Sequence, residues 1–317
     1  MRGLLNQFGW LLPDTQSLHI CHAFVADQVS KARMKERLDP LVAERAPWLF
    51  RPGTVSRFAR RTFMSLLSYD QTIDLATVLK DQTAGSLMHH VGALLAQDVC
   101  VSGLHHVPRK GPAIVVANHP TGIADGIMLH HMLAPIRPDL FFYANADILR
   151  VLPQMSDMIA PVEWRHDKRC HGKTRETMAY TRAAVEQDRL GVIFPSGRLA
   201  KRRGLRLYER PWMASAAMIA RKFDLPVIPI HIEARNSALF YVLDLIHPTL
   251  RDITLFHETL NKNTQPFRIR VGQALPASDL PKNSEDGIAM LRDATLRLAK
   301  DPQGRVSVRP RWIAQRA

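Results

Sequence analysis

From about residue 96 onward, short apolar runs alternate with segments of helical periodicity, and this alternation constrains the fold more than any other feature. The helical segments place apolar residues three and four positions apart, whereas the short runs are continuously apolar, as in strands that are buried on both faces. We predict strands at 113–117, 140–144, 159–163, 227–233, 267–273 and the start of 191–197. Predicted helices include 125–133, 174–188, 212–223 and 284–298. The pattern indicates an α/β fold with a mostly parallel mixed sheet flanked by helices.

The N-terminal part of the chain lacks strong strand signals. We therefore predict two parts, a helical region at 1–95 and an α/β domain at 96–317. Within the first, the segment 56–70 mixes Arg57, Arg60 and Arg61 with aromatic and aliphatic residues. Two interpretations stay open: an amphipathic helix lying at a bilayer interface, or a helix packed on the main domain with its arginines in water.

The chain is strongly basic. It has 43 Lys and Arg residues against 29 Asp and Glu, which leaves a formal net charge of +14. Such a surface attracts polyanions, namely nucleic acid, anionic lipid headgroups or phosphorylated metabolites. A nucleic-acid-binding protein is one alternative, but the sequence has no helix-turn-helix, zinc-finger or RRM signature. We expect no nucleic-acid partner.

Cysteine content and hydropathy bear on the compartment. The three cysteines, Cys21, Cys100 and Cys170, are widely separated and form neither a disulfide framework nor a CxxC metal site, so we expect a reducing compartment. The first residues lack the features of a signal peptide, and no stretch approaches the ~20 apolar residues of a spanning helix. If the protein acts on membranes, we expect it to act from the surface.

Polar residues follow the carboxyl ends of four predicted strands. They are His119 and Asp125 after the first, Asn145 after the second, Arg165 after the third, and Ser196, Gly197 and Arg198 after the fourth. Open α/β sheets bind their ligands at this edge. We therefore predict that these residues gather in one site.

The pair His119 and Asp125 predicts base chemistry. A histidine acts as a base near neutral pH when a carboxylate fixes its ring and tautomer. Gly122 allows the chain to fold back so that Asp125 reaches His119, although Asp125 also suits the start of the following helix as a cap. The sequence lacks a GxSxG elbow, so the economical hypothesis is that the nucleophile is a hydroxyl of the substrate.

Basic residues dominate the stretch 196–210. An arginine after a strand and a glycine suits bidentate binding of phosphate or carboxylate, and Arg198 is the best candidate. For Lys201 to Arg206, a solvated basic loop is as good an interpretation. The histidine pairs at 89–90, 105–106 and 130–131 lack an HExxH pattern or a nearby cysteine pair, so we expect no metal site.

These motifs together resemble the lysophospholipid acyltransferase superfamily, the glycerolipid acyltransferases. The segment GLHHVPRKGPAIVVANHPTGIADG (103–126) is similar to the family's strand followed by N-H-x4-D, and FPSGR (194–198) falls where the family has F-P-E-G-T-R. ADILRVLPQMSDMIAPVEWR (146–165) and LPVIPIHIE (225–233) are similar to two further segments in the family's order. The resemblance covers roughly residues 101–235.

Two departures from the family pattern are informative. The histidine and aspartate are separated by five residues instead of four, and Ser196 stands where the family has a glutamate. These changes, with 137–145 and 233–241, resemble the branch of the ornithine-lipid O-acyltransferases and haemolysin-like acyltransferases.

The resemblance implies a direct transfer mechanism. His119, oriented by Asp125, deprotonates the acceptor hydroxyl, which attacks an acyl thioester without an acyl-enzyme. Asn118 and backbone amides of the turn with Gly122 are candidates for stabilising the oxyanion. The donor is acyl-CoA or acyl carrier protein, and no metal or redox cofactor is implied.

The resemblance also implies a membrane-lipid acceptor. We expect a lyso-aminolipid such as lyso-ornithine lipid, bound with help from Asn145, Arg165 and the 196–198 segment; the alternative is acylation of 1-acylglycerol-3-phosphate to phosphatidic acid. The enzyme would be peripheral, on the cytoplasmic face of the inner membrane, attracted by anionic lipid.

Overall fold

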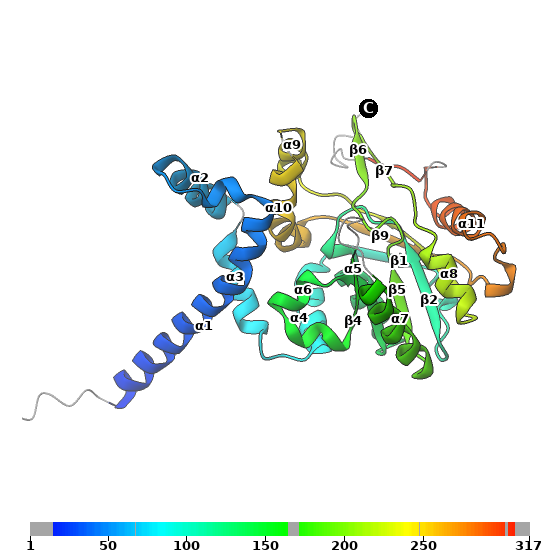
Figure 1. Cartoon of the computed structure of the whole chain (residues 1–317), viewed down its shortest axis with the longest axis horizontal. Helices are drawn as coiled ribbons and strands as arrows, with labels where there is room; N and C mark the ends of the chain where they lie inside the picture. The colour runs from blue at the N-terminus through cyan, green and yellow to red at the C-terminus, as the bar shows by residue number, and fades with distance from the viewer. Residues whose placement is uncertain (1–14, 67, 164–170, 247, 302–303, 308–317) are drawn as a thin grey trace, which may run out of the picture.

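The computed structural model describes residues 15–66, 68–163, 171–246, 248–301 and 304–307, and it has a mixed seven-stranded sheet at its centre (Figure 1). The strand order is β1-β9-β8-β2-β5-β3-β4, and every neighbouring pair is parallel except β8 with β9. The bounds are β1 Val99–Ser102, β2 Ala113–Ala117, β3 Leu140–Asn145, β4 Ile159–Val162, β5 Leu190–Ile193, β8 Val227–Glu233 and β9 Phe267–Val271. The predicted α/β class with a mostly parallel mixed sheet is confirmed.

Helices cover both faces of this sheet. Their bounds are α4 Ala84–Leu95, α5 Ile123–Leu133, α6 Asp147–Val151, α7 His171–Glu186, α8 Ser215–Lys222 and α11 Ser284–Arg297. Alternate residues of β2 serve the two layers because successive side chains of a strand point to opposite faces. Val115 and Ala117 pack with α4 and α5, whereas Ile114 and Val116 pack with α7, α8 and α11.

A small antiparallel sheet stands at the carboxyl end of β5, with strand order β10-β7-β6. It comprises β6 Lys201–Arg203, β7 Arg206–Tyr208 and β10 Val306–Ser307. Part of the basic stretch is therefore a hairpin and not a loop. The interpretation of Lys201 to Arg206 as a solvated loop is wrong about the loop, but Lys201, Arg203 and Arg206 are exposed to solvent. Leu207 anchors the hairpin among apolar side chains of α9 and β10.

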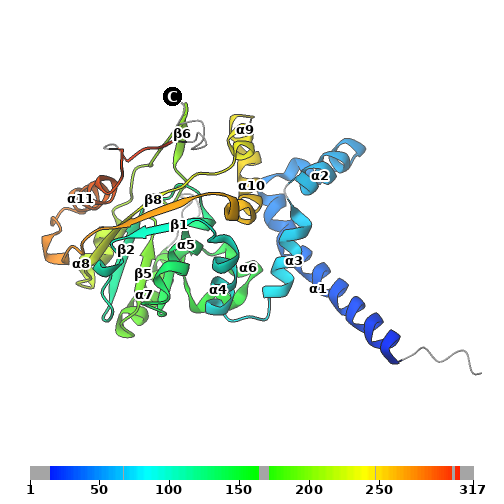
Figure 2. The same ribbon diagram turned by 180° about the vertical axis from the view of Figure 1, so that it is seen from behind.

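The remaining helices lie beside the sheet and beyond it: α1 Thr15–Arg45, α2 Thr54–Leu66, α3 Tyr69–Leu79, α9 Ala238–Ile246 and α10 Pro248–Leu260. Figures 1 and 2 show α1 to α3 on the far side of α10 from the sheet. Met34, Leu38 and Ile73 form the core of this arm, with Val151 of α6. In contrast, α4 packs on the sheet, so helical residues before 96 contribute to the main core. The boundary at 95 stays a prediction.

Helix α2 packs by one face within the N-terminal helices, not on the main domain, and its other face is exposed; its place at a bilayer interface stays a prediction. Phe63 packs edge-on against Trp48, with ring centroids 5.8 Å apart, whereas Phe58 is 74% exposed. The three arginines of α2 are also exposed. Leu67 lies outside the described residues. Within the described part of the chain, no helix combines the length and the hydropathy needed to cross a bilayer.

Candidate active site

The turn of residues 118–122 joins the buried strand β2 to α5, and we call it the catalytic turn after the role predicted for His119. Asn118 ties it to the neighbouring strand: its Nδ2 donates to the carbonyl of Ile232 at 2.9 Å, and its Oδ1 accepts from the Ile232 N–H at 2.7 Å. Gly122 has φ +98°, a conformation that side-chain-bearing residues rarely adopt. The turn is thus fixed at one end by β8 and made possible at the other by glycine. A contribution of Asn118 to an oxyanion hole stays a prediction.

His119 and Asp125 meet at this turn. His119 Nδ1 lies 2.9 Å from Asp125 Oδ2, and the carboxylate is fully buried. The N–H direction of the ring does not yet meet hydrogen-bond geometry with that oxygen. Catalytic contacts are often poorly aligned until substrate binds. The 2.9 Å distance shows that the fifth residue between His119 and Asp125, one more than in the family pattern, does not separate their side chains.

Asp125 is held from its other side by the helix start. Its Oδ2 accepts backbone N–H groups of Thr121 (2.9 Å) and Gly122 (3.0 Å), and its Oδ1 accepts the Thr121 hydroxyl at 2.6 Å. Gly122 is the N-cap of α5 and Asp125 is its third residue. The two sequence interpretations of Asp125, helix capping and histidine partner, are thus both satisfied by one carboxylate.

The imidazole of His119 is enclosed but reachable. It stacks on Phe194 at the end of β5, with centroids 4.3 Å apart and planes 24° apart, and its side chain is 18% exposed. Its backbone is fixed on both sides: the carbonyl accepts the Ala200 N–H at 2.8 Å, and the N–H donates to Glu209 Oε2 at 3.2 Å.

Glu209 is a site residue that the sequence analysis missed. It follows the hairpin and accepts the Trp212 indole N–H through Oε1 at 2.9 Å, besides the His119 N–H. Burial disfavours the carboxylate and raises the pKa of Glu209 above its ordinary value, although these hydrogen bonds act in the opposite direction. Only the return of the chain through the hairpin brings Glu209 to His119, and no local sequence motif signals it.

Three arginines, named here the arginine cluster, lie near the catalytic turn: Arg198, Arg210 and Arg251. Arg210 Nε donates to the carbonyl of Leu199 at 2.8 Å, and Arg251 pairs with Asp244 at 3.2 Å. Partial burial lowers the pKa of Arg210, and the charges of Arg251 and Arg198 lower it further. Mutually repelling guanidinium groups favour binding of an anion. Arg210 and Arg251 were not predicted as site residues.

The other predicted residues have local contacts. Ser196 is buried and donates to the carbonyl of Arg198 at 2.9 Å, and Gly197 has φ +59°, so together they shape the turn that presents Arg198. Asn145, at the end of β3, forms a local turn before α6: its Oδ1 accepts the Asp147 N–H at 3.0 Å. Arg165 lies outside the described residues. Where the structure describes the chain, no three His, Cys, Asp or Glu side chains are grouped to hold a metal ion.

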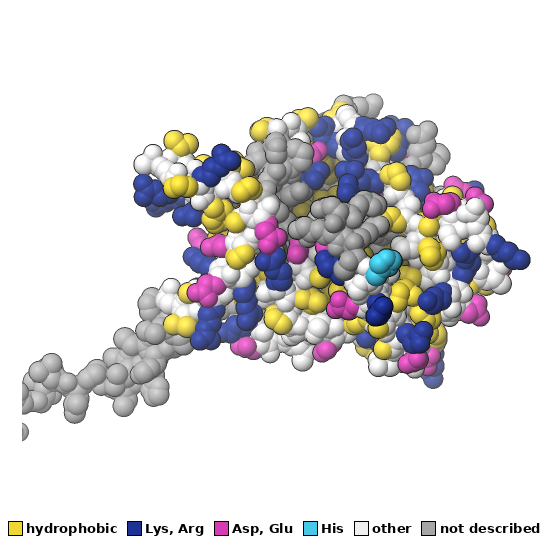
Figure 3. Space-filling model, in the orientation of Figure 1, with side chains coloured by type: hydrophobic (Ala, Val, Ile, Leu, Met, Phe, Trp, Pro, Cys, Tyr) yellow, Lys and Arg dark blue, Asp and Glu magenta, His cyan; other side chains and the backbone are white. Residues whose placement is uncertain are grey.

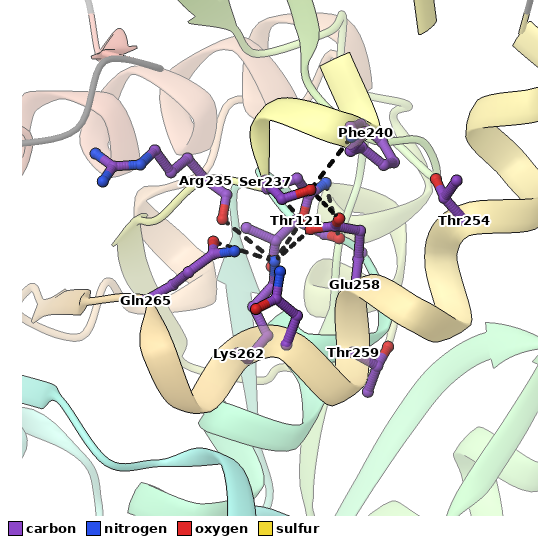
Figure 4. A network of polar contacts seen from close by, with 12 residues as sticks. Thr121, Arg235, Ser237, Phe240, Thr254, Glu258, Thr259, Lys262 and Gln265 are labelled. Atoms are coloured by element: carbon purple, nitrogen blue, oxygen red, sulfur yellow. Dashed lines mark hydrogen bonds and ion pairs between the residues drawn. The ribbon is translucent and has the colours of Figure 1, made fainter. Parts of the chain in front are cut away.

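A buried polar network lies behind the catalytic turn (Figure 4). Lys262 is fully buried, and its Nζ contacts Asn236 Oδ1 at 2.7 Å and Glu258 Oε2 at 3.1 Å. Asn236 Nδ2 in turn donates to the carbonyl of Thr121 at 3.4 Å, and Thr121 holds Asp125. Burial lowers the pKa of Lys262, while Glu258 and the more distant Asp125 raise it. The network connects α10 and the short 3-10 helix η5, Asn261–Thr264, to Asp125, the partner of His119.

Part of the chain is similar in sequence to known acyltransferases. Residues 98–233 match the family model described as Acyltransferase. The lyso-glycine lipid O-acyltransferase of Phocaeicola vulgatus is 25% identical over 182 residues, which are 56% of this chain and 63% of that protein. The chain therefore spans a little under two thirds of that relative. The lyso-glycine lipid O-acyltransferase of Bacteroides thetaiotaomicron is 20% identical over 252 residues, 78% of this chain and 90% of that protein.

One solved structure is also similar in outline. The 1-acyl-sn-glycerophosphate acyltransferase PlsC from Thermotoga maritima has a TM-score of 0.45 and 14% identity, covering 86% of this chain and 94% of that chain. The family match itself contains His119, Asp125 and the 196–198 turn, the residues that the fold brings to one sheet edge. Over residues 98–233 the chain is therefore similar to the acyltransferases, and the relatives support the lysophospholipid acyltransferase superfamily that its motifs resemble.

Proposed function

We propose that this chain transfers a fatty acyl group from an acyl thioester to the hydroxyl of an anionic lyso-lipid. The observation that carries the proposal is the 2.9 Å contact between His119 and a fully buried aspartate at the carboxyl edge of the sheet. A carboxylate on Nδ1 leaves Nε2 as the basic nitrogen. His119 is reachable from solvent, so a lipid hydroxyl can approach it.

The reaction then proceeds without an acyl-enzyme. Nε2 of His119 takes the proton of the acceptor hydroxyl while its oxygen attacks the thioester carbonyl, forming a tetrahedral intermediate. The carbon–sulfur bond breaks as the carbonyl re-forms, and the thiolate takes the proton from His119. Asp125 stabilises the imidazolium between these steps. The donor is acyl-CoA or acyl carrier protein, and the residues need no cofactor for this sequence of steps.

The acceptor that fits best is a lyso-aminolipid. The arginine cluster suits a carboxylate or a phosphate, because a guanidinium binds either with two parallel hydrogen bonds. Ser196 in place of the family's glutamate favours a headgroup other than glycerol phosphate, and two relatives are named for lyso-glycine lipid. Lyso-ornithine lipid is the other aminolipid candidate. Phosphatidic acid synthesis is the alternative, since a phosphate also fits the cluster.

A substrate competition tests this assignment. Purified protein is given acyl-CoA or acyl carrier protein together with equal amounts of lyso-glycine lipid, lyso-ornithine lipid and 1-acylglycerol-3-phosphate. We expect an aminolipid to be acylated first. Preferred acylation of 1-acylglycerol-3-phosphate would move the protein to phosphatidic acid synthesis, and no transfer to any lyso-lipid would reject the proposal.

The acceptor resides in a bilayer, so the protein must reach it there. We propose that it docks as a peripheral protein on the cytoplasmic face of the inner membrane, through anionic lipid and the exposed arginines of α2. Each basic residue near an anionic surface contributes on the order of 1 kcal/mol, and salt screens this attraction. Docking on anionic vesicles should therefore weaken as the salt concentration rises.

A further inference from the structure

Helix α9 exposes an apolar tip. Val242, Leu245 and Ile246 are 52, 69 and 65% exposed, although the opposite face of the helix is also apolar and is buried. A helix that is apolar on both faces needs a partner on each. The buried face packs on the small sheet, where Phe240 and Tyr241 meet Leu207. The exposed face has no such cover within the described part of the chain.

Two neighbouring elements share this character. At the tip of the β6–β7 hairpin, Leu205 is 49% exposed between arginines, and Lys201 and Arg203 are exposed as well. On α2, Val55 and Phe58 are 81 and 74% exposed among the arginines of that helix. Neither α2 nor the segment 198–208 contains an aspartate or a glutamate. The hairpin and α2 thus combine exposed apolar and basic side chains, and α9 adds exposed apolar side chains beside one carboxylate, Asp244, which is paired with Arg251.

The three elements project in one direction. Figures 1 and 2 show α2, α9 and β6 on the same side of the molecule, and Figure 3 shows Lys and Arg side chains gathered over α2 and the hairpin. Helix α10 holds them in place. Ser68, between α2 and α3, contacts His257 of α10 at 3.1 Å, and Arg251 of α10 pairs with Asp244 of α9.

This side is also the side of the catalytic turn. Leu255 of α10 and Leu199, just before the hairpin, approach the Cα of Gly122 so closely that an added Cβ would meet them at 3.1–3.3 Å. An acceptor leaving a bilayer at α9 or the hairpin would therefore arrive next to His119. Apolar tips ringed by cations are the surface that an anionic membrane binds.

We propose that the tip of α9, the tip of the hairpin and the outer face of α2 form one membrane-docking surface that inserts into an anionic bilayer around the catalytic edge. This proposal rests on the proposed function, because it concerns how the enzyme reaches a lipid acceptor. It extends docking beyond α2, which the sequence had singled out. The shallow insertion comes from α9 and Leu205, and the attraction comes from the basic residues.

The experiment measures binding of the full chain to phosphatidylglycerol vesicles and to phosphatidylcholine vesicles by sedimentation. The double variant Leu245→Glu/Ile246→Glu changes the tip of α9 only. Met218→Glu is the matched control, since Met218 is 55% exposed on α8, at the other end of the molecule. We expect the double variant to bind phosphatidylglycerol vesicles at least about tenfold more weakly, with Leu205→Glu showing a smaller loss and Met218→Glu none. Melting temperatures show that the variants are folded.

Two outcomes would overturn the proposal. In one, the α9 double variant binds vesicles as well as the Met218→Glu control does. In the other, the variant dissociates a dimer without changing vesicle binding, which would assign the apolar tip to a second copy of this chain. Acyl transfer is not part of the readout, so failure of the proposed reaction in the substrate competition would be distinguishable from failure here.

Discussion

Two buried cations, Arg137 and Lys262, lie at opposite edges of the sheet, and they differ in the groups to which they donate hydrogen bonds. Arg137 is 2% exposed and Lys262 is fully buried. Arg137 precedes β3 and donates to Asp139 at 2.6 and 2.9 Å and to the carbonyls of Pro108 and Asp188 at 2.8 and 2.7 Å. These carbonyls precede β2 and β5. Arg137 thus ties together the amino ends of three parallel strands.

Lys262 lies at the carboxyl edge and contacts side chains that lead to the catalytic turn. Through Asn236 and Thr121 its network reaches Asp125, the partner of His119. Similar burial therefore has different consequences. A change at Arg137 should act on the free energy of unfolding, whereas a change at Lys262 should act on the rate through the position of Asp125. The following variants test this division.

The largest effect is expected at the catalytic edge itself. His119→Ala should lower kcat by roughly 10²–10⁴-fold, the usual contribution of a positioned base. The free energy of unfolding should stay close to that of the wild type, because Nδ1 of the imidazole makes no aligned hydrogen bond with the described residues. Steady-state kinetics and chemical denaturation measure both quantities. A rate within a few-fold of wild type would remove His119 from the mechanism.

At the opposite edge, the double variant Arg137→Met/Asp139→Asn should lower stability and leave the rate unchanged. It removes both charges but leaves the carbonyls of Pro108 and Asp188 without their donor. Each unpaired carbonyl costs about 1–3 kcal/mol, so we expect the free energy of unfolding to fall by roughly 3 kcal/mol. Denaturant titration measures this loss. A fall in kcat for the folded protein would contradict the division between the two edges.

The same pair predicts a pH dependence. Burial alone would raise the pKa of Asp139, but the hydrogen bonds and the charge of Arg137, together with backbone hydrogen bonds, outweigh burial, and the net direction is downward from 3.8. A carboxyl group with a lowered folded-state pKa contributes stability that is present above its unfolded pKa and is lost as the pH falls through the folded pKa. Wild-type stability should therefore drop below about pH 4 more steeply than that of Arg137→Met/Asp139→Asn.

The matched variant at the catalytic edge is Lys262→Met/Glu258→Gln. Neutralising both partners avoids an unpaired buried charge, but Asn236 Oδ1 and Gln265 Oε1 lose their donor, so we expect the free energy of unfolding to fall by about 1–3 kcal/mol for each. Asn236 loses the ammonium that orients it, so its hydrogen bond to the Thr121 carbonyl weakens, and Thr121 in turn holds Asp125 less firmly. We expect kcat to fall on the order of tenfold, since a small displacement of a catalytic group is costly. An unchanged kcat with lower stability would make Lys262 equivalent to Arg137.

The sequence predicted those parts of the molecule that depend on local patterns. Strands β2 and β8 agree with the predicted ranges residue for residue, because continuously apolar runs between turn signals have few alternatives in an α/β chain. Helix α11 begins at Ser284, as predicted for 284–298, with Asn283 as its N-cap. The contact of His119 with Asp125 also followed from a short turn.

What the sequence did not show depends on distant segments. β1 was not predicted, since Val99–Ser102 becomes a strand only by pairing with β9, which is far away in the chain. Glu209 and Lys262 carry no motif, because each reaches the site only through the folded positions of the hairpin and α10. Buried charges of this kind are set by tertiary contacts and not by periodicity.

The smallest expected effect concerns Glu209, a partly buried carboxylate at the catalytic edge that accepts from the His119 N–H and the Trp212 indole N–H. Trp212→Phe removes the indole N–H that Glu209 accepts and keeps a buried ring. Burial raises the pKa of Glu209, and losing this donor raises it further. A carboxyl group with a raised folded-state pKa contributes stability at low pH that is lost as the pH rises through the folded pKa. Trp212→Phe should therefore lower the free energy of unfolding by about 1 kcal/mol more at pH 8 than at pH 4.

The smaller ring also leaves a packing defect, but the loss of stability from that defect does not depend on pH. Unfolding free energies at both pH values separate the two contributions, and an equal loss at both would show that Trp212 supports the site by packing alone.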